Sequence, residues 1–146
     1  MAKVNPIGKQ YVLTEPGEAL NVSPMIAKLA LPNGTFAQVK RAYVDAASNA
    51  TTELIPADAG LVFRVLNLVM LHGGTAGTVT FKSGTDAISC TFSNAANGGM
   101  VLPFNTAGWL QTLDVDKALN VTVSTSSACG VLVNYIEVPA DCFDLL

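Results

Sequence analysis

The chain has 146 residues, of which 50% are hydrophobic and only 13% charged, and its formal net charge is -3. This length suits one domain with one core. Typical soluble domains carry roughly 25% charged residues, so the sparse charge predicts that neighbouring subunits cover part of the surface. The acidic balance, with Lys40-Arg41 as the only adjacent basic pair, argues against direct nucleic-acid binding, and no apolar run is long enough to cross a membrane as a helix.

Residues 1–34 differ from the rest because they hold four of the seven prolines and show no sustained alternation. We therefore expect an extended N-terminal arm, which a neighbouring subunit would have to hold in place. Two alternatives stay open near its end. Ser23-Pro24 would cap a short helix from Met25 to Leu31, or the same residues would form a strand that enters a hairpin turn at Pro32-Asn33-Gly34.

Residues 61–71 form the most apolar run of the chain, and the rest is expected to be organised around it. Pro56 and Gly60 precede the run and Gly73-Gly74 follow it, while its valines favour a strand over a helix. Neither alternating face is polar, which is typical of a strand covered on both sides. We predict a central strand with one face in the core and part of the other against something else.

A period of two runs from residue 35 to residue 139 and predicts eight or nine short strands separated by turns. They are expected over residues 36–44, 51–55, 61–71, 78–82, 87–92, 100–104, 108–112, 119–124 and 129–138. This pattern indicates an all-β chain with a single β-sandwich of the jelly-roll or Greek-key kind. The predicted organisation is an arm (1–34), a sandwich domain (35–139) and a C-terminal tail (140–146).

The three cysteines are odd in number and lack C-x-x-C spacing, which predicts reduced thiols and synthesis in the cytoplasm. Cys90 and Cys129 lie in phase with apolar strand positions. Cys90 should face inward with Ile88 and Phe92, opposite Val79 and Phe81 of the preceding strand. Both cysteines are therefore expected to be small core residues.

Candidate catalytic and metal-binding residues are few. His72 is the only histidine, and we expect it to be a solvated residue at the end of the central strand. The pairs Asp114-x-Asp116 and Asp141-x-x-Asp144 supply too few oxygens for a calcium site. No catalytic or phosphate-binding motif is present, so we expect no enzyme activity, no cofactor and no metal.

A series of turn and strand-end motifs runs from about residue 53 to residue 138. It comprises Ile55-Pro-Ala-Asp-Ala-Gly60, Arg64-Val-Leu66, Val79-Thr-Phe-Lys-Ser-Gly84, Ala87-Ile-Ser89, Ala95-Ala-Asn-Gly-Gly99, Val101-Leu-Pro103, Gly108-Trp109, Thr112, Ala118-Leu-Asn-Val121 and Gly130 to Tyr135. The series resembles the small β-sandwich proteins encoded in the head-gene modules of tailed bacteriophages, which are capsid decoration, or cement, proteins. The first 50 residues and the tail after Pro139 lie outside the resemblance.

The resemblance implies a non-enzymatic structural protein on the outer surface of the virion. Its partners would be the major capsid protein and further copies of itself, in a trimer that stabilises the shell. The family supplies no catalytic residue. A carbohydrate-binding protein that uses Trp109 and the Asn-rich loops, or a connector in the neck or tail of the same virion, remains an alternative.

Candidate contact residues are the apolar side chains of segments that cannot form a core alone. In the arm, the residues expected to bind the capsid are Val4, Ile7, Tyr11, Val12 and Leu13. The residues expected to contact other subunits are Trp109, Phe143 and Leu146.

Overall fold

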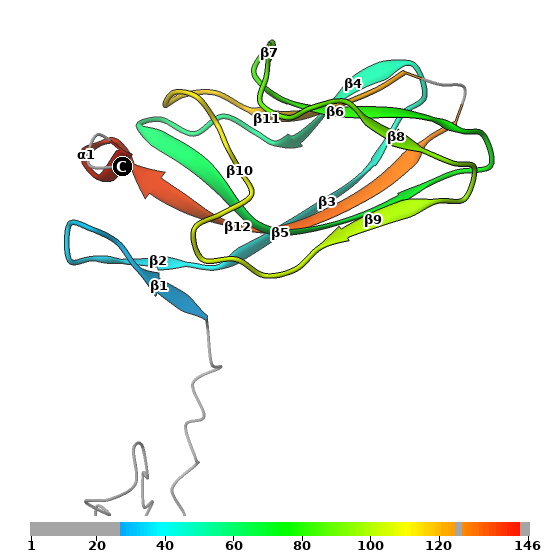
Figure 1. Ribbon diagram of the computed structural model, residues 1–146. Helices are drawn as coiled ribbons and strands as arrows, with labels where there is room; N and C mark the ends of the chain where they lie inside the picture. The colour runs from blue at the N-terminus through cyan, green and yellow to red at the C-terminus, as the bar shows by residue number, and fades with distance from the viewer. Residues whose placement is uncertain (1–26, 125–126, 144–146) are drawn as a thin grey trace, which may run out of the picture.

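The computed structural model describes residues 27–124 and 127–143, which form a sandwich of two antiparallel sheets (Figure 1). The first sheet has the order β3 (Lys40–Ala46), β12 (Cys129–Pro139) and β5 (Leu61–His72), and β9 (Gly99–Leu102) and β10 (Leu110–Gln111) both pair with β5. The second sheet has the order β4 (Ala50–Ile55), β11 (Leu119–Val123) and β6 (Gly77–Ser83), and β7 (Asp86–Ala87) and β8 (Phe92–Asn94) both pair with β6. The predicted all-β sandwich is confirmed.

The strand order is that of a jelly roll. The chain passes from β3 in the first sheet to β4 in the second, back to β5 and on to β6, and it returns through β8, β9 and β11 to β12. This interleaving places the first and last long strands, β3 and β12, side by side. Strand β12 lies between β3 and β5, which suits its apolar residues on both faces, and β9 ends just before Pro103 at the sheet edge.

A β-bulge in β5 explains why both alternating faces of this strand are apolar. The register with β12 shifts so that Asn134 pairs with Asn67 but Tyr135 pairs with Val65, which leaves Leu66 as the extra residue. Before the bulge, Phe63 and Val65 face the core between the sheets. After it, the even positions Leu68 and Met70 take their place.

The face of the first sheet that points away from the second sheet is covered along half of its length. A hairpin of β1 (Lys28–Ala30) and β2 (Phe36–Gln38) lies beneath it, and the short helix α1 (Ala140–Phe143) lies at its end (Figure 1). These elements form a second buried cluster with the sheet, comprising Leu31, Ala37, Val62, Leu66, Ile136, Val138 and Cys142. The expectation that part of the other face of β5 packs against something else is confirmed.

The hairpin decides between the two alternatives for the end of the predicted arm. Residues 28–30 form a strand, and the turn at residues 32–34 closes with a hydrogen bond from the Gly34 N–H to the Leu31 carbonyl. The side-chain oxygen of Asn33 accepts bonds from the N–H and the hydroxyl of Thr35. The strand and hairpin prediction is therefore confirmed, and a helix reaching Leu31 is wrong.

The structure contradicts two predictions of side-chain burial, those for Cys90 and His72. Cys90 is exposed, not buried, because the predicted strand over residues 87–92 is interrupted between β7 and β8. There the Ser89 hydroxyl accepts the Phe81 N–H at 2.9 Å, so a side chain takes the place of a backbone partner. His72 is buried, not solvated, because the bulge puts the even positions of β5 on the core side. Cys129 is buried as predicted.

Candidate interaction surface

The other half of the outer face of the first sheet carries exposed apolar side chains. The exposed Tyr43, Val69 and Val101 and the half-buried Leu132 are register partners on four successive strands and form one row across the sheet. Leu71 lies two residues further along β5. We call these five residues the apolar strip. The exposed fractions of Tyr43, Leu71 and Val101 are 78%, 62% and 67%. Neighbouring apolar side chains with such exposure are typical of an interaction surface.

Two opposite charges border the apolar strip, one on each side of Tyr43 along β3. The Arg41 guanidinium reaches toward β12, where its Nε donates to the Asn134 Oδ1 at 3.3 Å. The Asp45 carboxylate also lies over β12, because a Cβ added to Gly130 would meet the Asp45 Oδ1 at 3.4 Å. The two charged groups therefore lie on either side of Leu132, the register partner of Tyr43.

The outer face of the second sheet has the opposite character. Thr122 pairs with Thr51 on one side and with Thr80 on the other. The Thr51 and Thr122 hydroxyls are 2.7 Å apart, and those of Thr80 and Thr91 are 3.1 Å apart. Such hydroxyl pairs stabilise neighbouring strands and remain compatible with water. The sandwich thus carries the apolar strip, bordered by two charges, on one outer face and hydroxyl groups on the other.

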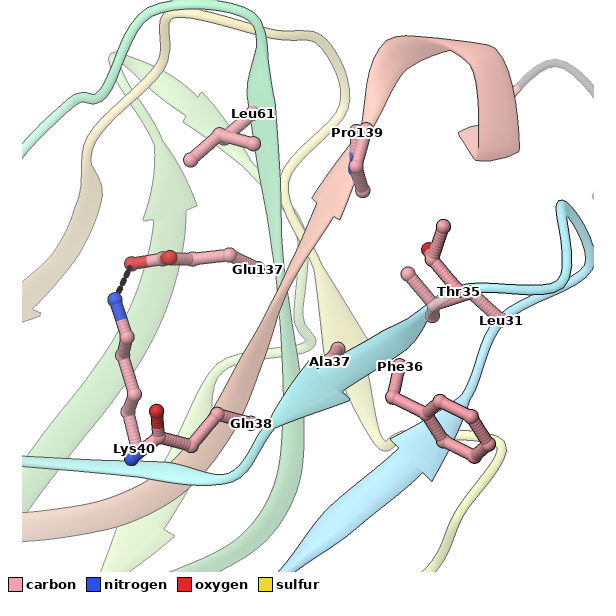
Figure 2. Close-up of a pocket in the computed structure, with 9 residues that line it drawn as sticks. All are labelled: Leu31, Thr35, Phe36, Ala37, Gln38, Lys40, Leu61, Glu137 and Pro139. Carbon is pink, nitrogen blue, oxygen red and sulfur yellow. Dashed lines mark hydrogen bonds and ion pairs between the residues drawn. The ribbon is translucent and has the colours of Figure 1, made fainter.

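An open groove of about 330 Å³ lies where the hairpin meets the ends of β5 and β12 (Figure 2). Its walls are about equally polar and apolar: Leu61 and Pro139 lie beside Gln38 and Lys40, while Phe36 is 68% exposed. The polar contact in its wall is the ion pair of Lys40 with Glu137.

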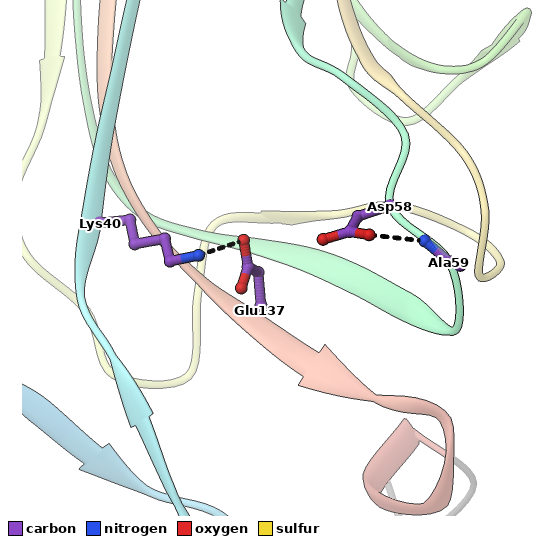
Figure 3. A network of polar contacts seen from close by, with 4 residues as sticks. All are labelled: Lys40, Asp58, Ala59 and Glu137. Carbon is purple, nitrogen blue, oxygen red and sulfur yellow. Dashed lines mark hydrogen bonds and ion pairs between the residues drawn. The ribbon is translucent and has the colours of Figure 1, made fainter.

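The ion pair in the groove joins β3 to β12 at 2.6 Å between the Lys40 Nζ and the Glu137 Oε1 (Figure 3). The hydrogen bond to Glu137 raises the pKa of Lys40. Asp58, whose carboxylate accepts the Ala59 N–H at 2.8 Å, also raises it through its negative charge. Because the Lys40 side chain is 42% exposed, solvent screens the pair, and its contribution to stability is small.

The raised pKa values of three side chains indicate that the folded protein loses stability in alkaline solution. Burial raises the pKa of the Cys129 thiol and of the Tyr135 phenol, and the pKa of Lys40 is also raised; their ordinary values are 9.0, 10.0 and 10.5. The unfolded chain therefore releases these protons first, so the stabilisation is complete below pH 9 and is lost as pH rises through the higher folded-state values. Urea unfolding from pH 7.5 to 10.5 should show a falling midpoint. The Cys129→Ala variant should begin its decline at higher pH, and a flat profile would contradict the prediction.

Trp109 is 43% exposed and lies just before β10. Its indole N–H donates to the Pro103 carbonyl at 2.6 Å, and its backbone N–H donates to the Val65 carbonyl. Gly108 has a φ of +82°, and a Cβ there would meet the Arg64 side chain at 2.5 Å. Trp109 is therefore held firmly against β5 with part of its ring exposed, which keeps it a candidate for subunit contact.

The remaining predicted contact residues are not brought together in the described part of the chain. Phe143 is the last residue of α1. Leu146 and the five predicted arm residues, Val4, Ile7, Tyr11, Val12 and Leu13, lie outside the described residues. The apolar strip was not predicted as a site, although apolar residues on both faces of segments 61–71 and 129–138 were the signal for it.

Among the described residues, no group of three or more His, Cys, Asp or Glu side chains is arranged to hold a metal ion. The described part of the chain also contains no helix long and apolar enough to cross a membrane.

No protein-family model and no curated protein matches the chain. Among solved structures, the chain is similar to one in the capsid asymmetric unit of cyanophage Pam1, with 14% identity, a TM-score of 0.44 and coverage of 90% of this chain and 99% of that one. It is also similar to a chain in the virus-like particle of extra small virus from the giant freshwater prawn Macrobrachium rosenbergii. That match has 10% identity and a TM-score of 0.38, and it covers 92% of this chain and 95% of the other.

Proposed function

We propose that the protein is a non-enzymatic structural component of a bacteriophage capsid, which binds the outer surface of the assembled major capsid protein lattice as a homotrimer and stabilises the shell. The observation that carries the proposal is the contrast between the two outer faces. The exposed fraction of 67% at Val101 and 78% at Tyr43 calls for protein neighbours on one side, while the threonine hydroxyls suit the other side to water. The motifs between residues 53 and 138 support the assignment to a phage capsid.

Stabilisation of the shell follows from preferential binding. A protein that binds the assembled lattice better than free capsid subunits shifts the equilibrium toward the lattice by mass action. Burial of apolar surface contributes about 25 cal/mol per Å², and an arm adds contact area once its ordering cost has been met. A trimer adds a further gain, because three arms on one body bind together at high effective concentration.

The arm is the part of the chain that this proposal assigns to the capsid. Deleting residues 1–20 should leave the sandwich folded and the oligomer intact, because the described sandwich begins after this segment. Binding to expanded capsids of the phage that encodes the protein should be abolished, since Val4, Ile7, Tyr11, Val12 and Leu13 are removed. Co-sedimentation with purified expanded capsids measures the binding, and the full-length chain is the control. Undiminished binding of the truncated chain would contradict the assignment.

Copy number distinguishes a decoration protein from a connector. A decoration protein occupies hundreds of lattice sites, whereas a connector forms a single ring at one vertex. Quantitative gel analysis of purified virions, with the major capsid protein as internal standard, therefore tests the proposed role. A ratio of only a few copies per particle would assign the protein to the neck or tail instead.

A further inference from the structure

We propose that the apolar strip pairs face to face with the apolar strip of a second copy of this chain, across a two-fold axis that runs along the row Tyr43, Leu132, Val69 and Val101. In this arrangement Arg41 of each copy meets Asp45 of the other. The contact goes beyond the proposed function, because it joins copies of this chain whether or not a capsid is present. On a capsid it would link neighbouring trimers.

The positions of the two charges select this axis. Arg41 and Asp45 lie two residues before and two residues after Tyr43, so all three side chains project from the same face of β3. A two-fold rotation about the row exchanges the positions before and after it. The rotation therefore places Arg41 over Asp45 of the second copy on both sides of the axis, which is the self-complementary pattern of an isologous contact.

The side-chain positions fit such a contact. The Arg41 guanidinium bonds to Asn134 and the Asp45 carboxylate lies over Gly130, so both charged groups are above β12 and border Leu132. The rotation runs the strands of the two copies antiparallel, which agrees with aligned packing of sheets at about 10 Å. An arginine that faces an aspartate can bridge this distance, while Tyr43 and Val69 fill the space between the sheets.

The size of the face predicts how strong the contact is. The face is four strands wide, at about 4.8 Å per strand, and five residues long, at about 3.3 Å per residue. Its area is therefore roughly 300 Å² per copy. A standard interface buries about 800 Å² per partner, so two copies alone should associate weakly and reversibly. Several such contacts per oligomer would strengthen one another. Self-association should therefore appear only as the protein concentration rises.

Charge exchange tests the two-fold arrangement directly. Sedimentation velocity of the full chain should show larger species with increasing concentration. Arg41→Asp and Asp45→Arg should each weaken this association at least tenfold, because each places like charges in contact. An equimolar mixture of the two variants should restore it, since every acidic position then faces a basic one. The double variant Arg41→Asp/Asp45→Arg should also associate like the original chain.

Matched substitutions on the other sheet serve as the control. Glu53 and Lys82 are both register partners of Asn120 on the hydroxyl-rich sheet, so Glu53→Arg and Lys82→Asp should leave association unchanged. A concentration-independent size of the original chain would overturn the proposal, and so would single variants that associate normally. Failure of the mixture to restore association would overturn the two-fold axis. None of these outcomes depends on capsid binding, which the arm deletion tests separately.

Discussion

The Phe63→Ala variant should unfold with a free energy about 3–5 kcal/mol lower than that of the original chain, because it removes a large side chain from the centre of the core. Phe63 is only 1% exposed. Its ring meets that of Tyr135 edge to face, with 5.9 Å between the centroids and an angle of 87°. The surrounding strands cannot collapse into the space, because two hydrogen bonds hold the Phe63 backbone to the buried Thr112. The Phe63 N–H donates to the Thr112 hydroxyl, and the Thr112 N–H donates to the Phe63 carbonyl.

The same substitution at an exposed position provides the control. Phe36 is 68% exposed in β2, so Phe36→Ala should change the free energy of unfolding by no more than about 0.5 kcal/mol. Urea unfolding followed by tryptophan fluorescence and by circular dichroism measures both variants. Similar losses for Phe36 and Phe63 would contradict the placement of the core between the two sheets.

The pattern of the sequence predicted the sandwich because period-two alternation depends on local burial, and the two sheets bury one face of most strands. Strand β11 shows this clearly, since Leu119, Val121 and Val123 are buried and the polar residues between them are not. The bounds predicted for the last strand, residues 129–138, also agree with β12 (Cys129–Pro139) to within one residue. These features are encoded within a few neighbouring residues.

Features that depend on a partner strand were not predictable in this way. The extra residue Leu66 is visible only in the register of β5 against β12, and it decides that His72 is buried. The exposure of Cys90 depends on a bond between the Ser89 hydroxyl and Phe81, eight residues away. An apolar pattern predicts that a side chain is shielded from water, but it does not predict which element or which molecule shields it.

The apolar strip follows the same logic. Segment 61–71 has the same apolar character on both sides of the bulge, yet the hairpin covers Leu66 and leaves Leu71 exposed. Tyr43 belongs to a strand with weak alternation, so only its alignment with Leu132 reveals the row. The apolar strip could therefore be identified only from the strand order and register. The low charge of the sequence predicted only that other subunits cover some part of the surface.

Leu66 and Val69 lie three residues apart on β5, and their truncation should separate folding from association. Leu66 is fully buried between the first sheet and the hairpin. Leu66→Ala should therefore lower the free energy of unfolding by about 2–5 kcal/mol through lost packing and a residual cavity. Val69 is 40% exposed in the apolar strip, so Val69→Ala should cost less than about 1 kcal/mol. Urea unfolding at a low protein concentration, where association is absent, measures both values.

Sedimentation velocity of the same two variants should give the reverse order. Val69→Ala removes apolar surface from the centre of the proposed contact and should weaken self-association severalfold, whereas Leu66→Ala leaves the strip intact and should associate normally in conditions where it is folded. This reversal is expected because one outer sheet face serves two purposes, with the hairpin covering one half and a second copy covering the other. Equal losses of stability for the two variants would show that the fold itself covers Val69, and the strip would then not be a free surface.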